Sequence, residues 1–273
     1  MDKAKKTAKT YGFLWAKGTG LNPVDIWHFN GMQEVIDEPI IRGRRGIEVG
    51  SGCGFDSYIM AKSNPSVQLI SMDMSDGIYK TREMTSGLGN VRTIQGSALE
   101  IPFKNNVFDF AYSFGVLHHT SNPEQGLCEI ARVLKNGSPA FLYLYEDHAE
   151  TPIKHFALNI VSSLRFITVK MPPAILNMLA WVASPLVFIL FTVPAKILKK
   201  FKITAYMAGK MPFNFGTTPF SLRGDLYDRF GAPIEYRYSR EQVFDIFTQA
   251  GFSDICVTRL KDTAGWVVWG HKV

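Results

Sequence analysis

A glycine-rich run is the part of this sequence whose residue types and spacing point most directly to chemistry. The run Glu48-Val49-Gly50-Ser51-Gly52-Cys53-Gly54 follows an apolar segment and precedes a helix-like one. Glycines let a backbone turn tightly and approach a ligand with no Cβ in the way. The run therefore predicts a ligand-binding turn, although a tight strand-to-helix connection without a ligand would use the same residues.

An acidic residue supports a nucleoside ligand. Asp73 ends the next apolar segment, and a carboxylate there can accept hydrogen bonds from both ribose hydroxyls of an adenosine group. The alternative is that Asp73 caps the following helix. The spacing Gly50-x-Gly52-x-Gly54 differs from the dinucleotide pattern Gly-x-Gly-x-x-Gly, which disfavours a nicotinamide oxidoreductase.

Two adjacent histidines offer a general base. His118 and His119 follow the fourth predicted strand, and imidazole is the side chain that most often moves protons near neutral pH. We expect His119, ahead of His118, to act as the base or to orient an acceptor. Alternatively, one caps a turn and the other packs. Glu146, Asp147 and His148 could join them around a metal, but nothing shows that these side chains converge, and we predict no metal.

Alternating elements must position these residues. Short apolar runs alternate with helix-like sequence from Arg45 to Glu146, which is typical of βαβ units on a parallel sheet. The predicted strands are Arg45–Gly50, Gln68–Met74, Val91–Gln95, Phe108–Phe114 and Ala140–Tyr145. The intervening helices are Asp56–Lys62, Gly77–Leu88 and Pro123–Leu134. The pattern returns as a helix at Ser239–Ala250, with Ser239 and Gln242 as a capping box, and a hairpin of Phe252–Arg259 with Trp266–His271.

The segment between these parts has a different composition. Met171–Ala195 contains no charged residue and no histidine, and the wider window Thr151–Lys210 holds eight basic residues and no acidic one. The whole chain carries +6, so everything outside that window carries −2. This distribution favours a local anionic partner over general binding to nucleic acid, and we predict no nucleic-acid partner.

A membrane surface would be such a partner. Twenty-five residues of helix reach about 37 Å, which would cross a hydrocarbon core of about 30 Å. A single crossing is excluded, because the elements before and after it must join one sheet. We therefore expect an interfacial or re-entrant hairpin, with Ile153–Thr168 as one arm, Pro185 breaking the other, and peripheral membrane contact through residues 153–202. The alternative is a pair of cap helices buried against the core or against a second subunit.

Composition limits the class of protein. With 46% apolar and 20% charged residues, the chain is typical of a folded globular protein. Its cysteines, Cys53, Cys128 and Cys256, are too few and too far apart for a disulfide framework or a cysteine-rich zinc site. The basic stretch Met1–Thr10 has no apolar run behind it, so we expect no secretory signal there. We expect a cytoplasmic protein at the inner face of a membrane.

Together these motifs resemble the class I S-adenosylmethionine-dependent methyltransferases with a type 11-like core. The resemblance covers Arg45 to about Tyr145 and returns in Ser239–Val273. The matching stretches are Glu48–Gly54, Ser71–Asp73, Gln95–Phe103, Phe108–Ser113, Val116–His119, Glu129–Lys135 and Ala250–Phe252. It implies a doubly wound, Rossmann-like, seven-stranded α/β sheet with an antiparallel C-terminal hairpin, interrupted by a helical insertion.

The resemblance also implies roles for individual residues around S-adenosylmethionine. Glu48 with Gly50, Gly52 and Gly54 would hold its methionine end, Asp73 its ribose, and Met74, Ser97 and Ala98 its adenine, while Ser113 and Phe114 would line the region of the sulfonium. Many members have Asp where Ser97 stands, so the adenine contact differs here. Residues before the first strand, including Tyr11, Trp15, Trp27 and His28, would form a lid or a helix packed on the core.

These expectations combine into one functional hypothesis. The chain would comprise an N-terminal lid (1–44), a cofactor-binding core (45–149), an apolar basic insertion (150–238) and a return to the core (239–273). It would methylate an O, N or C atom of an apolar, lipid-like acceptor. The alternatives are a soluble small-metabolite methyltransferase with a buried cap and a non-catalytic cofactor-binding partner in a membrane complex. The sequence leaves the acceptor, the methylated atom and the oligomeric state open.

Overall fold

The computed structural model describes residues 3–16, 41, 43–259 and 265–273 of the chain. These residues form two compact units. The first comprises the described residues up to Asp147 together with those from Ile234 to Val273, and the second comprises His148–Pro233. Each unit is described by itself below.

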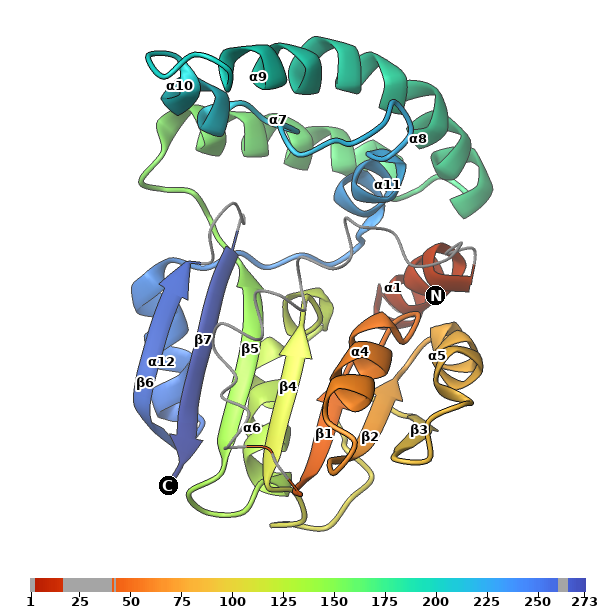
Figure 1. Cartoon of the computed structure of the whole chain (residues 1–273), viewed down its shortest axis with the longest axis vertical. Coiled ribbons are helices and arrows are strands. Elements are labelled where there is room, and N and C mark those ends of the chain that lie inside the picture. Colours follow the sequence, from red (N-terminus) through yellow and green to blue (C-terminus); the bar gives the residue numbers. More distant parts are fainter. Residues whose placement is uncertain (1–2, 17–40, 42, 260–264) are drawn as a thin grey trace. The chain divides into compact units, whose positions relative to one another are not determined.

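The first unit is built on a seven-stranded sheet in the order β3-β2-β1-β4-β5-β7-β6 (Figure 1). The parallel strands are β1 (Arg45–Val49), β2 (Gln68–Asp73), β3 (Val91–Gln95), β4 (Phe110–Phe114) and β5 (Pro139–Tyr145). The antiparallel pair β6 (Phe252–Arg259) and β7 (Gly265–Lys272) completes the sheet beside β5. The sequence-based prediction of a doubly wound sheet with a C-terminal hairpin is confirmed.

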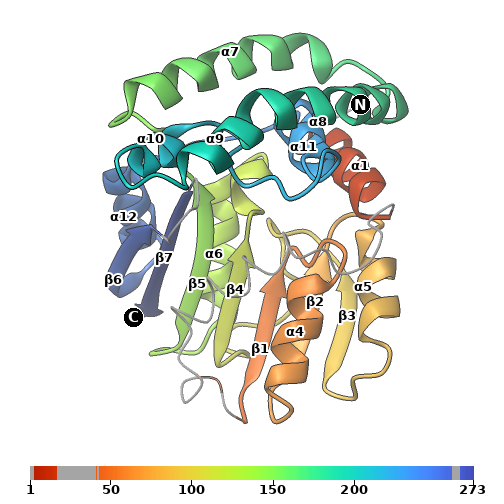
Figure 2. The same ribbon diagram turned by 45° about the horizontal axis from the view of Figure 1, so that its top comes forward.

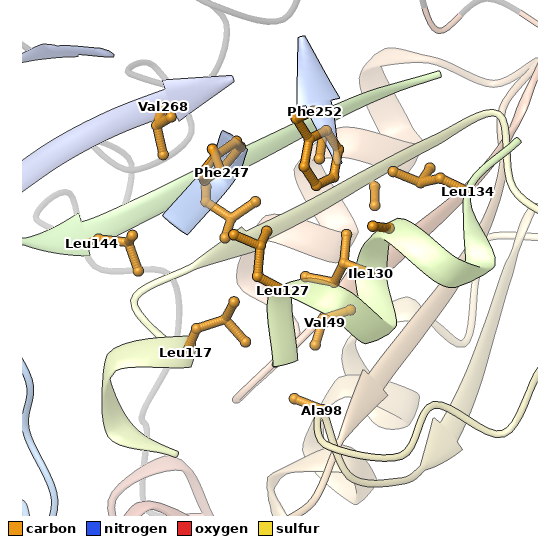
Figure 3. Close-up of a cluster of buried hydrophobic side chains, with 14 of the residues drawn as sticks. Val49, Ala98, Leu117, Leu127, Ile130, Leu134, Leu144, Phe247, Phe252 and Val268 are labelled. Carbon is orange, nitrogen blue, oxygen red and sulfur yellow. The ribbon is translucent and has the colours of Figure 1, made fainter. Parts of the chain in front are cut away.

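The central strands are largely apolar because helices cover both of their faces. Alternate residues of a strand point to opposite faces. Ala111 and Leu142 therefore join a cluster with residues of α6 (Pro123–Val133) and α12 (Arg240–Gln249), part of which Figure 3 shows. Tyr112 and Phe141 lie in a second cluster with residues of α4 (Phe55–Ser63). This double burial fixes the sheet, and with it the loops at its carboxyl edge.

Local signals set the helix boundaries of this unit. The Asn122 side chain accepts a hydrogen bond from the Gln125 N–H, and Pro123 occupies the first turn of α6. Ser239 and Gln242 form the predicted capping box of α12. The helices α1 (Lys3–Ala16) and α5 (Gly77–Thr85) pack against each other.

The second unit consists of helices and connecting turns (Figure 2). Its helices are α7 (Pro152–Thr168), α8 (Pro173–Val187), the π-helical turn η2 (Phe188–Thr192), α9 (Val193–Leu198), α10 (Ala205–Lys210) and α11 (Arg223–Gly231). The helix α11 packs against both α7 and α8.

Helix α8 continues through η2 into α9, so Pro173–Leu198 is one helix of 26 residues. The prediction that Pro185 breaks this helix is wrong. A proline removes one backbone hydrogen bond, and the helix accommodates it with wider π-type bonding over the next turn. Among the residues that the structure describes, this helix alone has the length and composition to cross a membrane, and 17% of its most apolar window is buried.

The chain leaves and re-enters the first unit at one edge of its sheet. The Asp147 N–H donates to the Tyr238 carbonyl at 3.1 Å, and the Tyr238 N–H donates to the carbonyl of Tyr145, the last residue of β5, at 2.9 Å. The two ends of the second unit are therefore attached side by side at the carboxyl edge of the strands.

Candidate cofactor and active site

A cavity of about 350 Å³ lies at the carboxyl edge of the sheet in the first unit. The loops after β1, β2, β3 and β4 line it, and α1 closes one side with Thr7, Ala8, Tyr11 and Trp15. Ligands of open α/β sheets bind at this edge. Eight of the twelve predicted site residues lie in its wall, namely Gly50, Gly52, Asp73, Met74, Ser97, Ala98, Phe114 and His119.

The glycine turn needs its glycines for both conformation and space. Gly50, Gly52 and Gly54 all have positive φ angles, of 91°, 55° and 84°. A Cβ on Gly54 would lie 2.5 Å from the Thr81 Cα, and one on Gly50 would lie 2.1 Å from a Val116 methyl. Gly54 itself does not line the cavity. The structure thus gives Gly54 a packing role and leaves Gly50 and Gly52 at the cavity wall.

Asp73 connects the first two loops. Its Oδ2 accepts a hydrogen bond from the Gly52 N–H at 2.8 Å, and its Oδ1 accepts from both the backbone N–H and the hydroxyl of Ser75 at 2.7 Å. Burial raises the pKa of Asp73, and these hydrogen bonds oppose the rise. A carboxylate offers about four acceptor positions. Asp73 therefore shapes the glycine turn and keeps acceptor capacity for a ligand.

Glu48 lies beneath the cavity and does not line it. Its side chain is buried, and its carboxylate accepts a hydrogen bond from the Ser57 hydroxyl. Burial raises the pKa of Glu48 to about 7, although the hydroxyls of Ser57, Ser71 and Tyr112 lower it. Glu48 consequently supports the floor of the turn from below.

The loops after β3 and β4 supply the rest of the wall. The Ser97 hydroxyl accepts a hydrogen bond from the Leu99 N–H at 3.1 Å and keeps its own proton for a ligand. Met74 is half-exposed at the wall, and Phe114 is buried. Ser113 points elsewhere, because its hydroxyl donates to the Val49 carbonyl at 2.8 Å, so it joins β4 to β1 without lining the cavity.

His119 combines exposure to the cavity with a fixed ring. Its Nδ1 lies 2.8 Å from the carbonyl oxygen of Ile234. A carbonyl accepts only, so Nδ1 carries the proton and Nε2 keeps its lone pair. The Tyr11 ring centroid lies 5.0 Å from that of His119, which places a phenol of α1 beside this imidazole. The arrangement places an oriented imidazole in the wall of the cavity.

His118 does not line the cavity. It is fully buried, and its ring lies 3.9 Å from that of Tyr145. Burial, with smaller contributions from His119 and Arg237, lowers the pKa of His118 well below its ordinary value. The neutral His118 ring, packed in this way, supports the position of His119. Glu146 is likewise engaged, because the Arg259 guanidinium donates to both of its carboxylate oxygens.

A match to a known domain family lies within the first unit. Residues 47–142 match the methyltransferase domain family, and this range contains the glycine turn, Asp73 and His119. The sheet has the seven strands and the antiparallel C-terminal hairpin expected from the resemblance. Residues 47–142 therefore form a methyltransferase domain of the class I S-adenosylmethionine-dependent family. The cofactor of the family is S-adenosylmethionine.

Other methyltransferases are similar to part of the chain. A tRNA (carboxymethyluridine(34)-5-O)-methyltransferase of Saccharomyces cerevisiae is 35% identical over 106 residues, covering 38% of this chain and 36% of that protein. A demethylmenaquinone methyltransferase of Staphylococcus carnosus is 31% identical over 118 residues, covering 42% of this chain and 47% of that protein. The chain therefore spans less than half the length of these relatives, and their names describe different acceptors.

One solved structure supports the fold along nearly the whole chain. A candidate O-methyltransferase of Nostoc punctiforme has a TM-score of 0.52 at 16% sequence identity, covering 98% of this chain and 69% of that one. At this identity the likeness shows the fold alone.

The cavity wall fits the cofactor of this methyltransferase family. A Cβ at Gly52 would lie 3.2 Å from the Trp15 indole, so the glycine keeps open the space between the turn and α1. Asp73 suits a ribose, and Met74, Ala98 and Leu99 offer apolar surface to a base. These residues would hold the cofactor.

Several wall residues were not predicted from the sequence, among them Thr7, Ser51, Ser75, Thr120 and Ser121. Four of them could have been found, because they lie close in the chain to the glycine turn, Asp73 or His119. These are Ser51, Ser75, Thr120 and Ser121. Thr7 could not, because nothing local to α1 shows which of its faces meets the cavity. Of the expected lid residues, Tyr11 and Trp15 line the cavity, whereas Trp27 and His28 lie outside the described residues.

Proposed function

We propose that this chain transfers a methyl group from S-adenosylmethionine to an apolar, lipid-like small molecule, with His119 as general base. The observation that carries the proposal is His119 itself, which lines the cavity while the Ile234 carbonyl fixes its tautomer. When bound, the cofactor supplies an electrophilic methyl group on a positively charged sulfur.

The residues of the cavity have separate tasks. Asp73 and the glycine turn bind and orient the cofactor, which matters because positioning supplies much of the rate of a displacement. His119 Nε2 would take the proton of the acceptor as the acceptor bonds to the methyl carbon and the bond from that carbon to sulfur breaks. The acceptor atom would be O, N or C.

An apolar acceptor is supported by the cavity wall and by one relative. Tyr11, Phe114 and Val116 lie in the wall together with His119. The relative named for demethylmenaquinone acts on a quinone, whereas the tRNA methyltransferase has a large polar acceptor. We favour the small apolar acceptor because the wall offers aromatic and aliphatic side chains.

Turnover of His119→Ala tests the base. We expect the rate to fall by about 10²- to 10⁴-fold with affinity for S-adenosylhomocysteine nearly unchanged, because the ring acts on the acceptor. Labelled cofactor incubated with lipid and polar extracts identifies the acceptor by mass spectrometry. Ser121→Ala, another change in the wall, is the control. Full activity of His119→Ala would contradict the base, and labelling confined to polar extracts or RNA would contradict the apolar acceptor.

Cofactor binding should depend on Asp73. Calorimetry of Asp73→Ala with S-adenosylhomocysteine should show a large loss of affinity, because two hydrogen bonds to a carboxylate contribute roughly 1.5–3 kcal/mol each. Asp76→Ala, which removes an exposed carboxylate three residues along, should bind normally. Unchanged affinity of Asp73→Ala would contradict the ribose assignment.

A further inference from the structure

The long helix Pro173–Leu198 exposes most of its large apolar side chains, and four of its five buried side chains are small or polar. Its buried residues are Leu176, Ala180, Ser184, Thr192 and Ala195. Its exposed side includes Ile175, Met178, Val182, Leu186, Ile189 and Leu190, here called the apolar helix face. A surface helix of a water-soluble protein has the opposite arrangement, with its large apolar residues toward the core.

The buried polar side chains of this helix form hydrogen bonds, so specific contacts hold this side of the helix inward. The Ser184 hydroxyl donates to the Pro219 carbonyl at 2.8 Å, and the Thr192 hydroxyl donates to the Phe213 carbonyl at 2.5 Å. Gly216 lies against Thr192, where a Cβ would come within 2.8 Å of its hydroxyl oxygen. The π-helical turn η2 rotates less per residue than an α-helix, which helps to bring Thr192 to the same side as Ser184.

The charge of the second unit indicates which kind of partner would cover the apolar helix face. The unit has ten basic and three acidic residues, a net charge of +7, while the remainder of the chain carries −1. Lys170 lies just before the helix, and Lys196, Lys199, Lys200 and Lys202 lie at its far end. The amino groups of Lys170 and Lys196 lie 4.1 and 5.1 Å from the ring centroids of Phe166 and Phe188, at the margin of apolar surface. An apolar face bordered by lysines complements an anionic lipid surface.

Two observations favour a helix that lies in the membrane surface over one that crosses it. The second unit is attached at both ends to the same sheet edge, through the hydrogen bonds of Asp147 and Tyr238, so the number of crossings must be even. A pair of crossings by α7 and α8 would carry α11 with them, because α11 packs on both. That helix holds the Asp225–Arg229 ion pair, which is costly in hydrocarbon.

We propose that the apolar helix face docks in the plane of an anionic lipid bilayer, with Lys170 and the lysines from Lys196 to Lys202 against its headgroups. This proposal stands apart from the proposed methyl transfer, because it concerns the second unit alone. A protein that binds bilayers without methylating any acceptor would support it and leave the function to be revised.

Vesicle flotation of the full chain tests the docking. The protein should float with phosphatidylglycerol vesicles at low salt and should bind weakly to phosphatidylcholine vesicles. Lys199→Gln/Lys200→Gln should weaken binding by about 25-fold, since each lysine contributes about 1 kcal/mol, or fivefold, near such a surface. Leu190→Asp should weaken it at least tenfold, because a charge would enter the apolar contact.

Matched changes in the first unit control for charge and for exposed apolar area. Arg92→Gln/Lys104→Gln removes two exposed cations, and Phe244→Asp replaces a half-exposed aromatic residue of α12. Both should bind vesicles as the unaltered protein does. Equal losses in test and control variants, or no flotation of the unaltered chain, would overturn the proposal.

Two further outcomes separate other occupants of the face. Washing cell membranes with alkaline carbonate should release the protein, and retention would overturn in-plane docking in favour of crossing helices. Analytical ultracentrifugation should show the same oligomeric state for Leu190→Asp as for the unaltered protein. A dimer that Leu190→Asp dissociates, without vesicle binding, would replace the bilayer with a second copy of the chain.

Discussion

The two units differ in where they place their large apolar side chains. The first unit buries them, and the second exposes them. In the first unit, Phe110, Tyr112 and Phe141 are almost completely buried between the sheet and its helices. In the second, Trp181, Leu190 and Phe201 are half-exposed or more. The first unit therefore has a core of its own, whereas the second presents its apolar surface outward. The difference indicates that the two units are suited to different surroundings.

The units also differ in the polar groups they bury. The first unit buries the carboxyl group of Glu48 and the imidazole of His118 beneath its cavity. The second buries the imidazole of His148 and the hydroxyls of Ser184 and Thr192, and each of these two hydroxyls donates to a backbone carbonyl. Buried ionisable groups make stability depend on pH, whereas buried hydroxyls do not. A change at Glu48 should therefore alter how stability depends on pH, whereas a change at Thr192 should alter stability without changing its pH dependence.

The largest expected contrast is between two leucines. Leu127→Ala in α6 should lower the free energy of unfolding by about 2–5 kcal/mol, because Leu127 is 0% exposed and its removal leaves a cavity. Leu190→Ala should change it by no more than about 0.5 kcal/mol, because Leu190 is 64% exposed. Urea denaturation followed by tryptophan fluorescence measures both. Similar losses would show that the outward face of the second unit is packed.

A second contrast is the pH dependence carried by Glu48. Because folding raises the pKa of Glu48 from 4.5 to about 7, its contribution to stability is present below pH 4.5 and is lost as the pH rises through 7. Relative to Glu48→Gln, the protein should lose roughly 3 kcal/mol over this range, at about 1.4 kcal/mol per unit. Denaturation curves at several pH values measure the difference. Parallel profiles for the two proteins would contradict the raised pKa.

The smallest expected effect concerns a buried hydroxyl of the second unit. Thr192→Val should lower the free energy of unfolding by about 1–3 kcal/mol, because the Phe213 carbonyl loses its donor. Thr192→Ser keeps the hydroxyl and should retain more of this stability. If the Thr192→Val variant proved as stable as the unaltered protein, packing without this hydrogen bond would hold the inward side of the long helix.

The sequence predicted the sheet well because its signals are local. The capping box at Ser239 and Gln242, the glycine turn and the apolar strand runs each act over a few residues, and the structure contains all three. The strand predicted from Phe108 begins at Phe110, because Phe108 pairs only as an isolated bridge with Leu134.

What the sequence could not show depends on contacts between distant residues. His119 could be proposed as a base, but the carbonyl that fixes its tautomer belongs to Ile234, 115 residues along the chain. The continuation of the long helix past Pro185 depends on a π-helical turn, and proline alone normally predicts a break. The inward direction of Ser184 and Thr192 is likewise set by carbonyls of the segment that follows.

The pairing of Glu146 with Tyr238 has a consequence for how this chain could change in evolution. Their bridge is parallel, and a parallel connection needs only about a dozen residues. The 86 residues of His148–Pro233 far exceed that requirement. The sheet therefore imposes little on what is inserted between these two positions. Such a junction is a natural exchange point, where one catalytic scaffold can acquire, enlarge or lose an accessory module while its own hydrogen bonding stays intact.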